Sequence, residues 1–207
     1  MKQIIALMAS LLLMFSLNAG AEVLSPDVLV KSTSQDVLTI IKQDKDIQSG
    51  NSKKVLELVE RKVLPHFDFG RMTMLAVGRH WSKASTSQKS DLTAQFRAML
   101  VRTYSAALTN YRDQAIDYRP LKMAATDTDV TVKTVIKQPG GQPIPIDYSL
   151  EKQESGWKIY DLAVDGVSLV TNYRGSFNAE IQNNGIDGLI KILADKNRSE
   201  SQDNKNK

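Results

Sequence analysis

Few side chains in this sequence are suited to covalent or metal chemistry. The chain has two histidines, His66 and His80, and no acidic residue stands at ligand spacing beside either of them. It has no cysteine, which excludes thiol catalysis, disulfides and thiolate metal sites. We therefore expect neither a metal nor a cofactor.

Asp161 and Asp165 come nearest to a catalytic pair. Two carboxylates can hydrolyse glycosidic bonds, but these two lie at the end of a predicted strand before Gly166, where an aspartate commonly caps the next helix. The chain also lacks a Gly-x-Ser-x-Gly elbow, a phosphate loop and a dinucleotide fingerprint. The sequence thus favours a protein that is not an enzyme. The alternative is an exported enzyme with Asp161 in a cavity.

The chain is instead rich in apolar faces that need a partner. The strongest runs from Leu92 to Tyr111 at spacings of three and four, which predicts an amphipathic helix over about 85–112. Its start, Ser85 to Gln88, has the form of a capping box. These faces either fill one another as an ordinary core or enclose a cavity for an apolar ligand. Tyrosines on or beside them suit the rim of such a cavity.

Other helices precede and follow this one. Cap and stop residues predict helices from Ser25 to about 45, from Asn51 to before Pro65, and from Asp68 to Gly78. Near the C-terminus, apolar spacing predicts a helix from Val167 that breaks at 184–185 and a short one to Leu193. The polar residues from Asp195 onward predict a disordered tail, 195–207.

Between these helices the apolar spacing changes to a period of two. It predicts strands over 115–121, 129–138, 143–153 and 157–164, joined by short turns, with Gly166 ending the sheet. Helices, then a run of strands, then helices indicate an α+β fold in which an antiparallel sheet packs against helices.

The N-terminus has the features of an export signal. Lys2 precedes an apolar run from Ile4 to Leu17, and Ala19-Gly20-Ala21 forms a cleavage site. The run is shorter than the roughly 20 residues of a membrane anchor. We therefore interpret 1–21 as a cleavable signal peptide and 22–194 as the working domain. The formal net charge of +4 is too small to indicate nucleic acid.

Several segments together resemble one known family. They are Val63-Leu64-Pro65-His66-Phe67-Asp68-Phe69-Gly70-Arg71-Met72, the residues 75–81 and 96–104, Trp157-Lys158-Ile159-Tyr160-Asp161-Leu162, and Asp165-Gly166-Val167-Ser168-Leu169-Val170 with Tyr173, Arg174 and Phe177. The chain resembles the MlaC, or toluene-tolerance, family from about Glu22 to Leu193.

The resemblance implies a fold, a function and partners. The fold would be a curved four-stranded antiparallel sheet of the NTF2-like type with helices and a helical lobe, enclosing a deep apolar pocket. The function would be that of a periplasmic carrier that shuttles phospholipid between the outer and inner membranes and maintains outer-membrane lipid asymmetry. Its partners would be an inner-membrane MCE-domain/ABC transporter complex and an outer-membrane lipoprotein–porin complex. We expect a monomer.

The residues expected to line the pocket are drawn from the long helix, the sheet and the later helix. They are Tyr104, Leu108, Tyr111, Val132, Ile146, Tyr148, Ile159, Val167, Val170, Tyr173 and Phe177. Each could equally be plain core. The arginines expected to meet partner proteins or lipid headgroups are Arg79, Arg97, Arg102, Arg112 and Arg174. A glutamate at Val170 is expected to abolish lipid retention in a folded protein.

Overall fold

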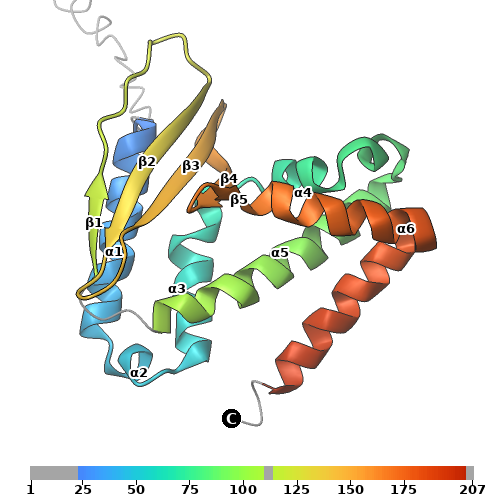
Figure 1. Ribbon diagram of the computed structural model, residues 1–207, viewed down its shortest axis with the longest axis horizontal. Coiled ribbons are helices and arrows are strands. Elements are labelled where there is room, and N and C mark those ends of the chain that lie inside the picture. Colours follow the sequence, from blue (N-terminus) through green and yellow to red (C-terminus); the bar gives the residue numbers. More distant parts are fainter. Residues whose placement is uncertain (1–22, 110–113, 204–207) are drawn as a thin grey trace, which may run out of the picture.

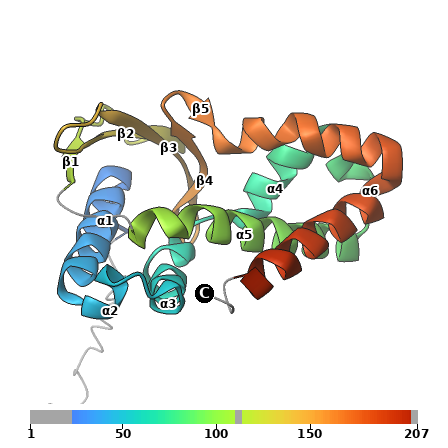
Figure 2. The same cartoon turned by 60° about the horizontal axis from the view of Figure 1, so that its bottom comes forward.

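The segments with helical apolar spacing form helices, and the segments with a period of two form one sheet between α5 and α6 in the chain. The computed structural model describes residues 23–109 and 114–203. In Figure 2 the sheet arches over α1 and the C-terminal end of α5, while α4 and α6 lie at the other end of α5. The helices are α1 (Pro26–Gln43), α2 (Lys45–Gln48), α3 (Ser52–Lys62), α4 (Phe69–Val77), α5 (Thr86–Thr109) and α6 (Leu169–Asp203), with 3-10 helices η2 (Leu64–His66) and η3 (Gly78–Lys83).

The predicted signal peptide, 1–21, lies outside the described residues. Within 23–109 and 114–203, no helix combines the length and the apolar character that crossing a bilayer requires.

Within the described part of the chain the sheet has five strands in the order β1 to β5, all antiparallel, and not the four that were expected (Figure 1). The strands are β1 (Ala115–Tyr118), β2 (Asp129–Lys137), β3 (Ile144–Gln153), β4 (Gly156–Val164) and β5 (Val167–Ser168). The additional strand follows from a tight turn, because Asp165 and Gly166 both adopt positive φ angles, 51° and 78°. Such a pair favours a two-residue hairpin. Val167 therefore pairs with Val164 and does not begin the helix.

Strand register places apolar side chains of β2, β3 and β4 on the same face of the sheet. Val132 lies opposite Tyr148, and Tyr148 lies opposite Leu162. We call this the inner face, because α1 packs against it through Leu29 and Val30. The opposite, outer face carries mainly polar residues, as the alternation of strands requires.

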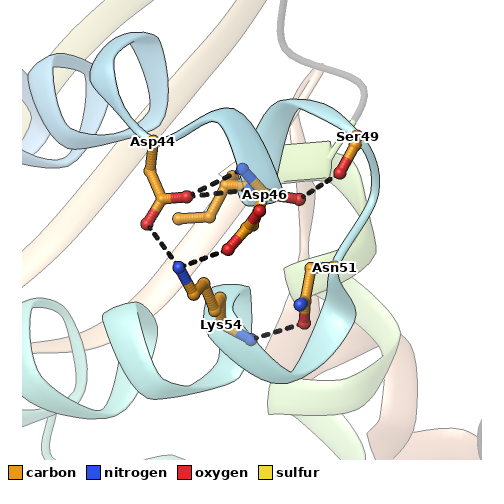
Figure 3. Close-up of polar contacts among 6 residues, drawn as sticks. Asp44, Asp46, Ser49, Asn51 and Lys54 are labelled. Atoms are coloured by element: carbon orange, nitrogen blue, oxygen red, sulfur yellow. Dashed lines mark hydrogen bonds and ion pairs between the residues drawn. The ribbon is translucent and has the colours of Figure 1, made fainter.

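The first predicted helix, expected to end at about residue 45, ends at Gln43, and Asp44 begins a new helical turn. The Asp44 carboxylate accepts hydrogen bonds from the backbone N–H groups of Asp46 and Ile47 and so caps the short helix α2. Lys54 Nζ lies 2.6 Å from Asp46 and 3.5 Å from Asp44, which ties α2 to α3 (Figure 3). Ile47 is buried beneath this corner.

Three other predicted helix starts are confirmed by their hydrogen bonds, whereas the Ser25 side chain does not cap α1 and instead donates to Asp27. Asn51 accepts a bond from the Lys54 N–H at the start of α3, as Figure 3 shows. Asp68 caps α4 by accepting from the Arg71 N–H. Ser85 and Gln88 form the reciprocal capping box of α5.

Helix α6 bends at Gly185, whose φ of 72° and ψ of −179° confirm the predicted break. It then continues to Asp203, so the predicted disordered tail is wrong for 195–203. The physical reason is a contact with α5. The Asn197 amide donates to the backbone oxygen and to the side-chain oxygen of Gln95, both at 2.9 Å. Asp195 and Arg198 also form an ion pair along the helix.

Among residues 23–109 and 114–203, the buried apolar side chains form three clusters. The helix cluster joins α4, α5 and α6 through Met72, Ala76, Val77, Leu92, Phe96, Met99, Leu100, Val170, Phe177, Ile181, Leu189 and Leu193. The sheet cluster joins α1 to the inner face through Leu29, Val30, Val130, Val132, Leu150, Trp157 and Ile159. The corner cluster joins α1, α2 and α3 through Val37, Ile41, Ile47, Val55, Leu58 and Val59.

Candidate functional site

The inner face of the sheet is the strongest candidate site for an apolar ligand. At one end, Leu150 and Ile159 are buried beneath α1. Along the same face Ile146, Tyr148 and Leu162 are only half-buried. The inner face is therefore apolar along its length but incompletely covered by the protein's own helices. A ligand with long apolar chains would complete that cover.

Tyrosines place hydroxyl groups within this apolar surface. Burial raises the pKa of the Tyr148 hydroxyl. The Tyr118 hydroxyl lies 2.6 Å from the Ser34 hydroxyl, which connects β1 to α1 at the edge of the inner face. Sequence analysis missed Tyr118, Leu162 and the Ser34 contact. Period-two spacing was the available signal for Leu162.

The predicted pocket residues on the sheet lie together on its inner face. Val132 and Ile159 belong to the sheet cluster, and Tyr148 packs against it. Ile146 follows on the same face, opposite Thr134. Their grouping on one surface is a consequence of strand register.

The predicted pocket residues on the later helix lie elsewhere. Val170, Tyr173 and Phe177 pack in or against the helix cluster. The rings of Tyr173 and Phe177 approach Phe96 on α5, with centroids 5.3 and 5.1 Å away. A glutamate at Val170 would thus place a carboxylate in the helix cluster, at a cost of several kcal/mol to folding. That substitution tests the core and not a pocket.

The remaining predicted pocket residues differ in exposure. Val167 is 58% exposed on β5, because the strand replaces the expected helical turn. Tyr104 is 39% exposed on α5, and Leu108 is half-buried against the corner cluster. Tyr111 and Arg112 lie outside the described residues.

Asp161, the alternative catalytic residue, makes structural hydrogen bonds where β4, β5 and α6 meet. Asp161 accepts hydrogen bonds from the N–H groups of Leu162 and Val170 and from the Ser168 hydroxyl at 2.5 Å. It pairs in register with Ser149, so it lies on the outer face and not in a cavity behind the inner face. The expectation of Asp161 in the cavity is therefore wrong, and its carboxylate instead secures the start of α6.

The four described arginines expected to meet partners or headgroups occupy different environments. Arg97 lies 3.5 Å from Glu60 and over the Phe69 ring, so it joins α5 to α3 and α4. Arg102 is half-buried on α5. Arg79 and Arg174 both line a cleft of about 670 Å³ between the end of α4 and α6. The structure thus brings together two of the predicted arginines.

Arg71 is an important residue that sequence analysis did not single out as a site residue. Its guanidinium pairs with Glu151 and, at 3.0 Å, with Asp129, and it lies 3.7 Å above the Tyr160 ring. Tyr160 also donates to Asp129 at 2.8 Å. Burial and the bond to Asp129 raise the pKa of Tyr160. This group, the Arg71 clamp, connects α4 to β2, β3 and β4. No local spacing reveals it, because the partners are far apart in sequence.

Comparisons with known proteins support the resemblance. Among curated proteins, the intermembrane phospholipid transport system binding protein MlaC of Haemophilus influenzae is 24% identical over 169 residues, covering 80% of this chain and 79% of that protein. The toluene tolerance protein ttg2D of Pseudomonas putida is 25% identical over 164 residues, covering 79% of this chain and 76% of that protein.

A solved structure is also similar. It is the phospholipid-binding protein from Ralstonia solanacearum in complex with a phospholipid, with a TM-score of 0.80 and 38% identity over 86% of this chain and 99% of that chain. The family model described as MlaC protein matches residues 31–195, which include the whole sheet, helices α2 to α5 and most of α1 and α6. The chain therefore belongs to the MlaC family.

Proposed function

We propose that this protein binds a phospholipid and carries it between membranes, with the acyl chains against the inner face of the sheet. The observation that carries the proposal is the similarity, over most of both chains, to a structure solved with a phospholipid. The incompletely covered inner face supports it, because Ile146, Tyr148 and Leu162 provide a surface for acyl chains.

The energetics of acyl chains explain why a carrier needs such a surface. Each buried methylene contributes about 0.8 kcal/mol, so two long chains lose roughly 25 kcal/mol of stabilisation when exposed to water. A carrier must therefore shield nearly all of both chains between membranes. Transfer requires no bond to be made or broken, and the proposed function assigns no catalytic residue.

The proposed setting is the periplasm, reached by means of the signal peptide at 1–21. There the carrier would exchange lipid with an outer-membrane lipoprotein–porin complex and an inner-membrane MCE-domain/ABC transporter complex, which supplies the energy. The expected consequence is maintenance of outer-membrane lipid asymmetry. The names of the curated relatives, which refer to intermembrane phospholipid transport and to toluene tolerance, support this setting.

Lipid extraction and native mass spectrometry of protein purified without detergent test the proposal. The wild type should retain about one or more phospholipids per chain. Ile146→Asn, on the inner face, should reduce that content at least about twofold, because it places an amide against the chains. Val135→Asn is the matched control: Val135 is also half-buried, but it pairs with Pro145 on the outer face.

Circular dichroism should confirm that both variants are folded. A wild type free of phospholipid would refute lipid carriage. Equal loss from the two folded variants would refute the inner face as the surface for the chains.

A further inference from the structure

The cleft between α4 and α6 contains two cationic side chains that the proposed lipid cargo does not use. Val77, Gly78 and Arg79 form one side, and Thr171, Arg174, Gly175 and Asn178 form the other. None of these residues is acidic. In the described residues, no carboxylate lies within ion-pair distance of Arg79 or Arg174. Two guanidinium groups therefore face one cleft without a described counter-ion.

Hydrogen bonds fix the positions of these groups and leave donors available. Arg174 Nε donates to the Leu75 backbone oxygen at 3.0 Å, which holds the side chain across the end of α4. The Asn178 side-chain oxygen lies 2.9 Å from His80 Nε2 and accepts from Arg79 at 3.4 Å. The Arg174 terminal nitrogens are thus free of these contacts, and a preformed guanidinium suits bidentate recognition of a carboxylate.

The space above Gly175 is open, so a ligand can approach the backbone there. A Cβ atom on Gly78 would lie 3.6 Å from Arg174 Nε, whereas a Cβ atom on Gly175 would meet nothing within 4 Å. Gly78 also adopts a φ of 61°, which a glycine accepts readily. The volume of about 670 Å³ is in the range of clefts that hold a drug-sized molecule. It is far larger than a single small ion needs.

We propose that this cleft binds an acidic segment of a partner protein, with carboxylates paired to Arg79 and Arg174. Charge complementarity carries the assignment, since the lining has two cations and no anion. The cleft is shallow and open to solvent, so a peptide segment can lie across it between the two helix segments. The inference goes beyond lipid binding and does not depend on it.

Titration of the ¹⁵N-labelled full mature chain with hexaglutamate tests the assignment, read by the amide signals of Gly78 and Gly175. The wild type should show saturable shifts that weaken with added salt. Arg79→Gln combined with Arg174→Gln should weaken binding at least about tenfold. The matched control, Arg61→Gln combined with Arg119→Gln, removes the same charge from exposed positions and should bind as the wild type does.

Arg174→Gln also removes the hydrogen bond to the Leu75 backbone oxygen, which could unfold the Arg79→Gln, Arg174→Gln variant. A second variant provides an independent test in that case. Gly175→Glu introduces a carboxylate where there is open space and helical backbone, and it should abolish hexaglutamate binding in a folded protein. Phospholipid content should stay at the wild-type level in every variant, which separates this site from the lipid surface.

Two other probes distinguish the competing occupants. Inorganic phosphate at equal charge should bind at least about tenfold more weakly than hexaglutamate, and flotation with vesicles containing phosphatidylglycerol should not depend on Arg79 and Arg174. Vesicle binding that is lost in the double variant, phosphate binding as tight as that of the peptide, or equal peptide binding by the two double variants would overturn the proposal.

Discussion

Replacing Arg71 by Met should destabilise the protein by about 2 kcal/mol. The side chain of Arg71 is 22% exposed, and those of Asp129 and Glu151 are 49% and 38% exposed. Partly exposed ion pairs contribute about 0.2–1 kcal/mol each. Stacking of a guanidinium on an aromatic ring, here at 3.7 Å from Tyr160, contributes about 0.5–2 kcal/mol. Met retains much of the apolar stem, so the loss isolates the charge and the stacking.

Urea denaturation followed by circular dichroism measures this loss. For a chain of this size the same change should lower the Tm by about 4–8 °C. Arg71→Lys retains the charge but loses the planar stack, and it should recover less than half of the lost stability. A double-mutant cycle with Glu151→Gln should give a coupling of at least about 0.5 kcal/mol. A loss below about 0.5 kcal/mol for Arg71→Met, or a coupling near zero, would refute the clamp.

Three further changes test other features. Phe177→Ala should cost about 3–5 kcal/mol in urea denaturation, because it removes a buried ring beside Phe96, whereas exposed Ser176→Ala should cost almost nothing. Gly185→Ala should cost about 1–3 kcal/mol of folding stability, because the backbone angles at this position suit only glycine. The control Gly175→Ala, at an open position within the helix, should not destabilise the protein. Equal melting temperatures for the two variants would contradict this account. Burial, followed by the charge of Lys158, lowers the pKa of His66 below its ordinary 6.5, so the neutral form stabilises the fold above that pH and the gain is lost as pH falls below it. His66→Gln should therefore lose less stability than the wild type between about pH 7.5 and 5.5, and an identical pH dependence would exclude this role for His66.

Local signals predicted helix ends and strand faces well. Asn51, Ser85 and Gln88 act through groups a few residues away, so their roles are visible in a short window of sequence. The sheet residues Val132 and Tyr148 share a face because register follows from alternation and short turns.

Long-range partners could not be predicted in this way. Spacing correctly gave Val170 and Phe177 an apolar helical face, but it did not indicate that this face meets α4 and α5 and not the sheet. The two-residue strand containing Val167 is too short to show a period. The Arg71 clamp depends on tertiary approach alone.

The helix cluster combines helices that precede the sheet in the chain, α4 and α5, with α6, which follows it, and this has a consequence for folding order. The sheet cluster is complete once the chain has been made as far as Ile159, whereas the helix cluster needs Val170 to Leu193. Chains are synthesised from the N-terminus. The apolar stripe of α5 therefore remains unpaired until α6, which follows the sheet in the chain, has been made. Until then the nascent chain presents an open apolar surface, which delays compaction and offers a binding target to chaperones.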